Sequence, residues 1–496
     1  MINILFNSYI FIFVFLPIVL ILYFISNKYN KFNIANIILI LSSLFFYAYN
    51  KPMYLIIIIS SIIVNYYIGT IIFDMEYTYK PLENKLIKKI LSKKFLFILG
   101  IVFNLFLLGY FKYYNFFLEN INSIFNIKIR YIQASLPLGI SFFTFQQISY
   151  LVDSYKSEGK KYKFLEYMLF VCFFPQLVAG PIVLPQEIIP QFEDKKNRKL
   201  NYKNISEGIY LFSIGLFKKV MIADTLSGIV NLGYSTLSTI NSFEAWLVAL
   251  SFTLQLYFDF SGYWDMAAGI ALMFNIKLPK NFNSPYKALN IQEFWKRWHI
   301  TLGRFLTQYI YIPLGGNRGS RFKTYRNLFI VFIVSGIWHG AGWNFIVWGT
   351  LHGLAIVIHR IFKDNGRKMN KILAWFLTFM FVNLAWVFFR APNLIISVQM
   401  LQKLIFIDFT PINNILQNGV SYISIIKNFT LLEAINNIYL SIFMFVLGTV
   451  IIFIKNSFQM KENFKASYLQ LGFIVTIFII TLLNLTNISE FLYFNF

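Results

Sequence analysis

The chain of 496 residues is short of charge and has almost no cysteine. Only 13% of its residues are charged, whereas a soluble globular domain carries about a quarter. Its single cysteine, Cys172, excludes a disulfide framework and any metal site built from several thiolates. Apolar residues take the place of the missing charge, since 57% of the chain is hydrophobic and 20% is aromatic. This composition argues against an ordinary soluble enzyme.

Apolar runs long enough to cross the roughly 30 Å hydrocarbon core of a bilayer recur along the chain. Examples are YIFIFVFLPIVLILYFI at 9–25, FLFILGIVFNLFLLGYF at 95–111 and YLQLGFIVTIFIITLLNL at 468–485. We therefore expect an all-α polytopic membrane protein with about ten or eleven crossings. No internal repeat or soluble domain interrupts the pattern, so residues 1–496 are predicted to form a single integral-membrane domain.

The net charge of +23 comes from 44 Lys and Arg against 21 Asp and Glu. These basic residues stand in short clusters between apolar runs, which is the positive-inside pattern and not a nucleic-acid-binding stripe. We expect the lipid bilayer as partner and no nucleic acid. With the basic clusters in the cytoplasm, the N-terminus lies outside and the first apolar run is retained as a span. The largest early cluster comprises Lys80, Lys85, Lys88, Lys89, Lys93 and Lys94.

Two apolar segments have cytoplasmic basic clusters on both sides, so neither is a simple crossing. Residues 164–184 contain FPQLVAGPIVLP, whose prolines and glycine fit either a re-entrant element or a proline-kinked helix pair. Residues 327–359 are long enough for two helical arms, with a junction at HGAGW (339–343). That arrangement places His339 at membrane depth. A histidine there needs a polar partner, a wet cavity or a chemical role.

The segment 290–320 is the most strongly patterned part of the chain. Its apolar side chains recur at helical spacing and its polar ones fall on the opposite side, which predicts an amphipathic helix at the cytoplasmic boundary. Pro313 and Gly315 end that helix, and His299 lies on its apolar flank. An interfacial helix anchored by tryptophan explains this pattern without any catalysis. The two faces are Phe294, Trp298, Leu302, Phe305 and Tyr309 against Arg297, Thr301, Arg304 and Gln308.

Two carboxylates stand within an apolar span, in YFDFSGYWDMAAG at 257–269. Buried carboxylates in membranes pair with a cation or line a polar path. We expect structural pairing for Asp259 and Asp265, with Arg297 or Arg304 as plausible partners. No sequence motif for a metal, a nucleotide or a serine nucleophile occurs, and His339 and His352 are too far apart for a metal-binding pair within one helical turn. No metal is expected.

Histidine near neutral pH can accept the proton of a hydroxyl group, which is what acyl transfer to an alcohol requires. Lysine and arginine at a cytoplasmic opening could hold the phosphates of an acyl-coenzyme A. For His339 taken alone, a packed core histidine with satisfied hydrogen bonds is the slightly favoured interpretation.

Five separated motifs resemble those of one family. FNIKLPKNFNSPYKALNIQEFWKRWHITLGRFLTQYIYIPLGGNRGS looks like the signature of membrane-bound O-acyltransferases (MBOAT) of the bacterial alginate O-acetylase branch. FFPQLVAGPI, YFDFSGYWDMAAG, GIWHGAGWNFIVWGTLHG and WVFFRAPN match the same branch in the same order. The resemblance covers about residues 1–400, with the family core over about 95–400, N-terminal spans over 1–94 and divergent C-terminal spans over 401–496.

The resemblance implies a ring of tilted helices around a central tunnel, with re-entrant and interfacial helices. It implies that His339 of the WHG motif is catalytic, as general base or acyl relay, and that His299 of the RWH motif assists. It also implies acetyl-CoA as the cytoplasmic acyl donor, with no permanently bound cofactor. We further expect six residues to support the donor site or the tunnel, namely Trp298, Arg297, Arg304, Asp259, Trp338 and Asn344.

Members of this branch acetylate alginate, cellulose or peptidoglycan, typically with an extracytoplasmic acetyltransferase partner. The resemblance therefore implies a bacterial cytoplasmic-membrane enzyme that serves O-acetylation of an extracytoplasmic polysaccharide. One alternative is D-alanyl transfer to teichoic acid from a carrier-protein thioester. A second is a transporter without acyl chemistry, which would distribute ionisable residues along a whole path and often repeat its two halves.

Overall fold

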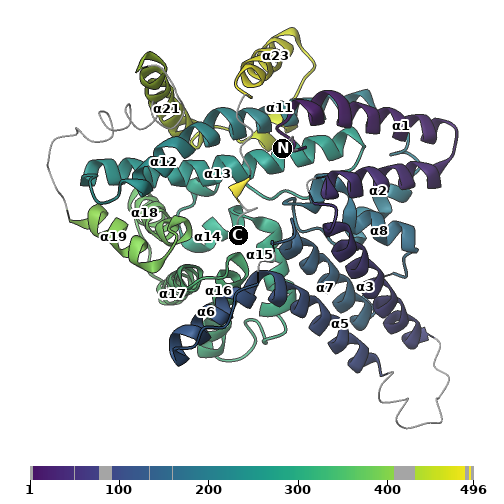
Figure 1. Cartoon of the computed structure of the whole chain (residues 1–496), viewed down its shortest axis with the longest axis horizontal. Helices are drawn as coiled ribbons and strands as arrows, with labels where there is room; N and C mark the ends of the chain where they lie inside the picture. Colours follow the sequence, from purple (N-terminus) through teal and green to yellow (C-terminus); the bar gives the residue numbers. More distant parts are fainter. Residues whose placement is uncertain are drawn as a thin grey trace. The chain divides into compact units, whose positions relative to one another are not determined.

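The computed structural model describes residues 4–49, 51–77, 92–132, 135–158, 160–406, 431–485 and 491–492. Every regular element among these residues is a helix, which confirms the all-α prediction (Figure 1). The lysines at 80–89 and residues 407–430 lie outside the described residues. Contacts divide the chain into two units, Met1–Phe212 with Met266–Lys280 and Ser213–Asp265 with Asn281–Phe496.

Five described helices are long and apolar enough to cross a bilayer, so the chain is a multi-pass membrane protein. The total of ten or eleven crossings stays a prediction. The five helical stretches are Phe11–Lys28, Tyr54–Met75, Lys93–Phe125, Trp343–Asp364 and Lys371–Arg390. Shorter apolar helices cover Phe32–Ala48, Leu394–Ile405, Tyr439–Ile451 and Tyr468–Leu483.

The first unit is a helical bundle in which α3, α5 and α7 pack side by side (Figure 1). Asn65 on α3 and Asn104 on α5 exchange amide hydrogen bonds within this bundle, so that two buried polar side chains satisfy each other. Helices of this unit are η1 (Phe11–Phe15), α1 (Leu16–Lys28), α2 (Phe32–Ala48), α3 (Tyr54–Tyr77), α5 (Lys93–Leu108), η2 (Gly109–Tyr113), α6 (Tyr114–Phe125) and α7 (Ile140–Lys156).

The proline-rich segment after α7 forms short helices instead of a span. It contains α8 (Phe164–Cys172), α9 (Phe174–Leu177) and α10 (Pro185–Glu193). At 1.5 Å per residue even α8 is only about 14 Å long, less than half of a bilayer core. Residues 169–183 are all buried. This geometry favours the re-entrant interpretation over a proline-kinked pair of spanning helices.

Helices α11 (Tyr202–Phe217) and α13 (Ser242–Met273) approach closely at glycines. In the first unit a Cβ atom on Gly269 would lie 2.6 Å from the carbonyl oxygen of Gly208. In the second unit a Cβ atom on Gly262 would lie 2.8 Å from the carbonyl oxygen of Gly215. Only glycine fits such contacts, which is the small-residue packing usual between membrane helices.

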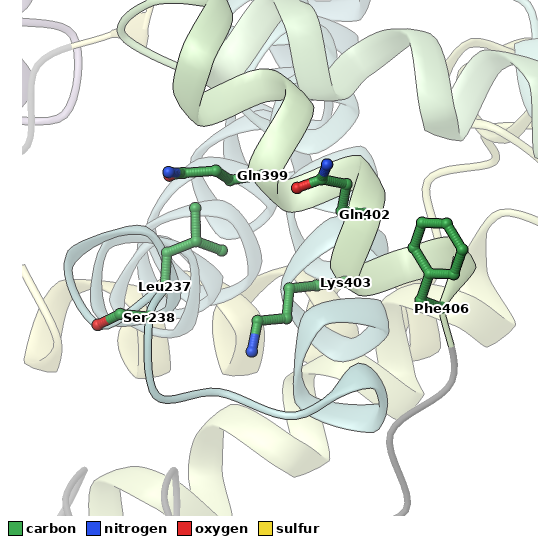
Figure 2. A pocket seen from close by; sticks show the side chains of 6 residues that line it. All are labelled: Leu237, Ser238, Gln399, Gln402, Lys403 and Phe406. Atoms are coloured by element: carbon green, nitrogen blue, oxygen red, sulfur yellow. The ribbon is translucent and has the colours of Figure 1, made fainter.

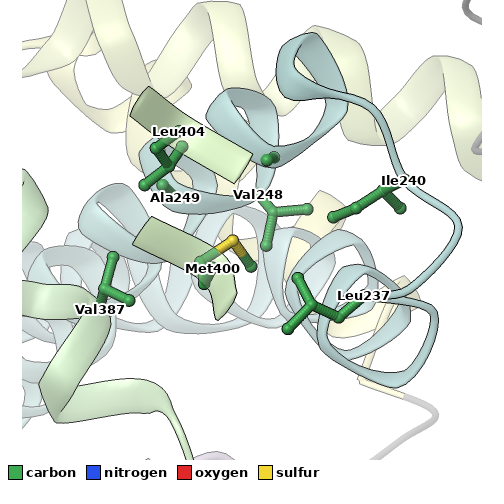
Figure 3. Packing of buried hydrophobic residues seen from close by; sticks show 8 residues of the cluster. Leu237, Ile240, Val248, Ala249, Val387, Met400 and Leu404 are labelled. Carbon is green, nitrogen blue, oxygen red and sulfur yellow. The ribbon is translucent and has the colours of Figure 1, made fainter. Parts of the chain in front are cut away.

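The second unit holds both of the predicted catalytic histidines. One of its hydrophobic clusters packs Leu237 of the connection between α12 and α13 with Val248 of α13 and Met400 of α19 (Figure 3). Its helices besides α13 are η3 (Lys218–Asp224), α12 (Thr225–Ser235), η4 (Pro285–Lys287), α14 (Ile291–Arg297), α15 (Ile300–Leu306), η5 (Thr307–Tyr311), α16 (Arg321–His339), α17 (Trp343–Asp364), α18 (Lys371–Arg390), α19 (Leu394–Ile405), α21 (Leu431–Ile451), α22 (Ser457–Glu462) and α23 (Tyr468–Leu483).

Candidate active site

The site is organised by a helical hairpin. Helix α16 ends at His339 and α17 begins at Trp343, and the two helices lie side by side (Figure 1). This confirms the predicted two arms and their junction. The helices touch at Gly336 and Gly349, where a Cβ atom would lie 2.4 Å and 2.5 Å from a carbonyl oxygen of the opposite helix. His339 follows the first of these glycines by three residues, so the close contact fixes its position.

His339 lies in an aromatic enclosure and is 2% exposed. Its ring centroid is 4.9 Å from that of Trp338, 5.0 Å from Trp348 and 5.3 Å from Phe389. As the last residue of α16 it also stands at the negative end of the helix dipole, which stabilises a protonated imidazole. An imidazole in this position is suited to receive a proton during a reaction.

His299 does not lie within one continuous amphipathic helix, and that prediction is wrong. Helix α14 ends at Arg297, α15 begins at Ile300, and His299 between them has a left-handed φ of 45°. Hydrogen bonds to Asn281 cause this break. The backbone carbonyl of Asn281 accepts from the backbone N–H of Ile300 at 2.9 Å, and the side-chain oxygen of Asn281 accepts from the backbone N–H and the hydroxyl of Thr301. Thr301, expected on a polar face, is therefore buried.

The same asparagine defines the protonation of His299. The side-chain oxygen of Asn281 accepts the backbone N–H of Thr301, and it lies 3.2 Å from His299 Nδ1. Nδ1 must therefore carry the ring proton, which leaves Nε2 as an acceptor. Burial lowers the pKa of His299 to about 3. The ring is thus neutral at physiological pH and suited to accept a hydrogen bond.

Trp338 connects the two histidines. Its ring centroid is 6.2 Å from that of His299 and 4.9 Å from that of His339. Trp298 is 1% exposed and its ring lies 5.1 Å from that of Trp386. The structure therefore brings together His299 from the α14–α15 junction with Trp338 and His339 from α16, and it places Trp298 beside Trp386 of α18.

Among the remaining predicted site residues, Arg297 and Asn344 have structural partners. Arg297 forms an ion pair with Glu293 at 2.7 Å and donates to the carbonyl of Asn283. Asn344 donates to the carbonyl of Ala391 at 2.7 Å and so joins α17 to the residue that follows α18. Arg304 is half-buried on α15. Their predicted role in donor binding stays a prediction.

A hollow of about 480 Å³ in the second unit is lined by other residues (Figure 2). It lies between α19 and the connection of α12 with α13, and neither His299 nor His339 is in its lining: Leu237, Ser238, Gln399, Gln402, Lys403 and Phe406. Among the described residues, no group of three His, Cys, Asp or Glu side chains is arranged to hold a metal ion. The tunnel implied by the resemblance stays a prediction.

The model of the membrane-bound O-acyltransferase family matches residues 43–398, which include both histidines and most of the chain. The chain belongs to this family.

It is similar to the peptidoglycan O-acetyltransferase of Helicobacter pylori, with 43% identity over 525 residues that cover 99% of this chain and 97% of that protein. It is also similar to the probable alginate O-acetylase of Pseudomonas aeruginosa, with 39% identity over 80% of this chain and 74% of that protein. A teichoic acid D-alanyltransferase of Bacillus subtilis is 27% identical over 49% of this chain and 66% of that protein. The chain is accordingly an O-acetyltransferase and a membrane enzyme.

The membrane-bound O-acyltransferase fold of this chain holds its two span carboxylates in ion pairs. Asp265 pairs with Lys218 at 2.7 Å and accepts from the hydroxyl of Ser457. Asp259 pairs with Lys219 at 2.7 Å and accepts from the backbone N–H of Leu492. Structural pairing is confirmed, but the prediction that Arg297 or Arg304 supplies the cation is wrong. The adjacent lysines lie on η3, and their occurrence within an apolar run was the signal that could have identified them.

Sequence reasoning also gave no role to His352 of this acyltransferase. His352 lies on α17, three residues after Gly349, and its ring is 4.7 Å from that of Trp348. The indole N–H of Trp295 donates to its Nδ1 at 3.2 Å. The signal in the sequence was a repeated pattern, GIWHG at 336–340 and GTLHG at 349–353, in which each histidine follows one of the two contacting glycines by three residues.

Proposed function

We propose that this enzyme moves an acetyl group from cytoplasmic acetyl-CoA across the membrane for O-acetylation of an extracytoplasmic polysaccharide, and that the polysaccharide is peptidoglycan. The observation that carries the proposal is the meeting of His339 and His299 at the ring of Trp338, inside the region that matches the family. Peptidoglycan is favoured because the peptidoglycan-acetylating relative matches 99% of this chain, whereas the alginate-acetylating relative matches 80%.

In this proposal His339 acts as the general base. The acceptor hydroxyl gives its proton to the imidazole while its oxygen bonds to the thioester carbon. The carbon–sulfur bond then breaks, and the coenzyme A thiolate takes the proton from the imidazolium. The end of α16 stabilises the transient cation, since the last carbonyls of a helix carry partial negative charge. His299, neutral and with Nε2 as acceptor, orients a donor group and does not itself become charged.

Donor binding and orientation in the membrane are part of the same proposal. The Lys- and Arg-rich interval 277–326 faces the cytoplasm and holds the phosphates of the donor, while the N-terminus lies outside. The membrane is the bacterial cytoplasmic membrane. A tunnel connects both aqueous sides at His339, and an extracytoplasmic acetyltransferase partner places the acetyl group on the polymer.

The test uses a strain that lacks this protein and carries either the wild-type chain or His339→Ala. We expect purified peptidoglycan from the His339→Ala strain to release no base-labile acetate above the deletion strain, at equal membrane levels of the protein. Acetate at the wild-type level in that variant would contradict the role of His339. Loss of acetate from a different surface polysaccharide, with peptidoglycan unchanged, would contradict the choice of polymer.

D-alanyl transfer from a carrier-protein thioester remains the second candidate, because a D-alanyltransferase is among the relatives. Isolated membranes incubated with labelled acetyl-CoA separate the two. Label incorporation that depends on His339 is expected for the acetylase, whereas a D-alanyl enzyme would leave acetyl-CoA unconsumed.

A further inference from the structure

Three ring nitrogens in the aromatic cluster that contacts His339 through Trp348 are buried without a hydrogen-bond partner among the described residues. They are Nε1 of Trp348, Nε1 of Trp386 and Nε2 of His352. The side chains are 0%, 1% and 0% exposed, so bulk water does not satisfy these atoms either. Buried polar groups in proteins are nearly always paired, and an unpaired group therefore needs an explanation.

All three groups are donors. An indole nitrogen can only donate, which settles the two tryptophans. For His352, Nδ1 lies 3.2 Å from Nε1 of Trp295, and that indole N–H must be the donor. His352 Nδ1 is therefore an acceptor with no proton, and the ring proton of the neutral imidazole is on Nε2.

The three rings form one cluster on α17 and α18. Their centroids are separated by 4.7 Å for Trp348 and His352, 5.8 Å for Trp348 and Trp386, and 6.2 Å for His352 and Trp386. Trp348 is also 5.0 Å from His339, ring to ring. The contact of Gly336 with Gly349 fixes the two helices that carry His339, Trp348 and His352.

We infer that the N–H groups of Trp348, Trp386 and His352 bind the carbonyl oxygen of the acyl thioester beside His339. This inference rests on the proposed function. When the acceptor oxygen bonds to the thioester carbon, the electron pair of the C=O bond moves to this oxygen and makes it an oxyanion. Collapse of the intermediate returns the pair to the C=O bond and expels the thiolate. Buried donors fixed in advance stabilise that charge more than the neutral ground state, which accelerates the reaction.

The chemistry of the cluster selects this ligand over other oxygen groups. A sugar hydroxyl gives its proton to His339 in the proposed mechanism and gains no negative charge, so donors fixed in advance around its oxygen would not accelerate the reaction. A phosphate would bring a full negative charge, and none of these three side chains carries a compensating cation. A carbonyl oxygen only accepts and is neutral before the reaction, so it fits an enclosure of neutral donors.

The first experiment removes one donor and keeps the ring. Trp348→Phe, and replacement of Trp348 by the isosteric β-(3-benzothienyl)alanine, delete the N–H without deleting a hydrogen bond of the resting protein. We expect acetyl transfer from labelled acetyl-CoA in membranes to fall about 100-fold in kcat in both variants. The melting temperature of the benzothienyl variant should not fall, because this variant loses only an unpaired buried donor. Trp246→Phe is the matched control, because its indole N–H donates to the carbonyl of Leu404 and not to a substrate. That variant should keep its kcat.

The second experiment identifies the oxygen that is bound. Purified full-length protein is titrated with acetyl-CoA and with S-ethyl-CoA, which has a methylene group in place of the thioester carbonyl. The wild type should bind acetyl-CoA more tightly than S-ethyl-CoA, and the benzothienyl variant should lose this preference. An equal loss of affinity for both compounds would assign the donors to another oxygen of coenzyme A and overturn the inference.

A kcat within threefold of wild type in the benzothienyl variant would also overturn the inference. The three N–H groups would then be hydrogen-bonded to ordered water and not to the substrate. His339→Ala is measured in the same assay. If His339→Ala were fully active, the proposed function itself would be wrong, whereas an inactive His339→Ala beside an active benzothienyl variant would contradict only the donor cluster.

Discussion

Two buried polar clusters of the second unit differ in how their hydrogen bonds are satisfied. Lys218 and Asp265, with the parallel pair Lys219 and Asp259, form ion pairs at 2.7 Å, and both carboxylates accept a further hydrogen bond. The cluster around Trp348 beside His339 has three buried donors that lack a hydrogen-bond partner among the described residues. The first cluster is complete within the protein, and the second becomes complete only with a ligand.

This difference distinguishes polar residues that stabilise the fold from polar residues that bind a ligand. A buried ion pair is costly to desolvate and survives only when its geometry and additional hydrogen bonds are good, as they are on η3 and α13. A buried donor without a partner costs about 1–3 kcal/mol. Proteins retain such an unfavourable feature mainly where function requires it. The cluster with unpaired donors, and not the cluster of ion pairs, therefore indicates where the substrate binds.

The largest expected effect comes from breaking an ion pair on one side. Lys218→Met leaves Asp265 buried without its cation, so we expect a loss of about 3–5 kcal/mol in the free energy of unfolding. Chemical denaturation of the detergent-purified protein measures this loss.

The matched control removes both charges. Lys218→Met combined with Asp265→Leu should recover most of the stability, since a buried ion pair replaced by apolar side chains is often neutral or stabilising. Acetyl transfer should persist in the double variant. A double variant that folds stably but is inactive would show that Lys218 and Asp265 serve the reaction and not only the stability of the fold. The distinction between the two clusters would then be wrong.

An intermediate effect is expected where the hairpin holds the donors against His339. In Gly349→Ala the added Cβ would lie 2.5 Å from the carbonyl oxygen of Phe332, and we expect a destabilisation of about 1–3 kcal/mol together with slower transfer. Gly342→Ala is the control, because its Cβ would lie 3.7 Å from the nearest atom, a side-chain carbon of Phe345. Equal melting temperatures for the two variants would contradict the close-contact account.

An effect that is absent at neutral pH and develops only in acid concerns His299, which is buried and hydrogen-bonded but can still be protonated. Its pKa is about 3 in the folded protein, against an ordinary histidine value of 6.5, so between these values the unfolded chain binds more protons. The stability is fully present above pH 6.5 and declines as the pH falls toward 3, by up to about 1.4 kcal/mol per pH unit. His299→Asn, which tolerates the left-handed φ, should show a shallower decline between pH 6.5 and 5. Identical slopes in denaturation curves would contradict the buried, neutral state of His299.

Much of this architecture could be predicted from the sequence because it depends on local patterns. Length and apolarity indicate membrane helices, glycines around His339 indicate a helix junction, and the prolines of 164–184 indicate broken helices. The histidine-bearing motifs agree with the family, and the structure places both at one tryptophan ring.

The remaining features depend on contacts between distant parts of the chain. The periodicity of 290–312 does not reveal that Asn281 intercepts the hydrogen bonds at His299 and Thr301. Two adjacent lysines in an apolar run do not specify which carboxylates they meet. The unpaired state of Trp348 can be recognised only when its surroundings are known, since an indole in a sequence looks the same with or without an acceptor.

The role of the His339 imidazole is measured by following the acetyl group from its donor to the polymer. Membranes that contain the wild-type chain, His339→Ala or no chain are incubated with acetyl-CoA labelled in its acetyl group, and label is counted in purified peptidoglycan. We predict incorporation only with the wild type, at equal amounts of membrane-inserted protein. Label from the His339→Ala membranes at the wild-type rate would contradict the account, because the acetyl group would then reach the polymer without this imidazole.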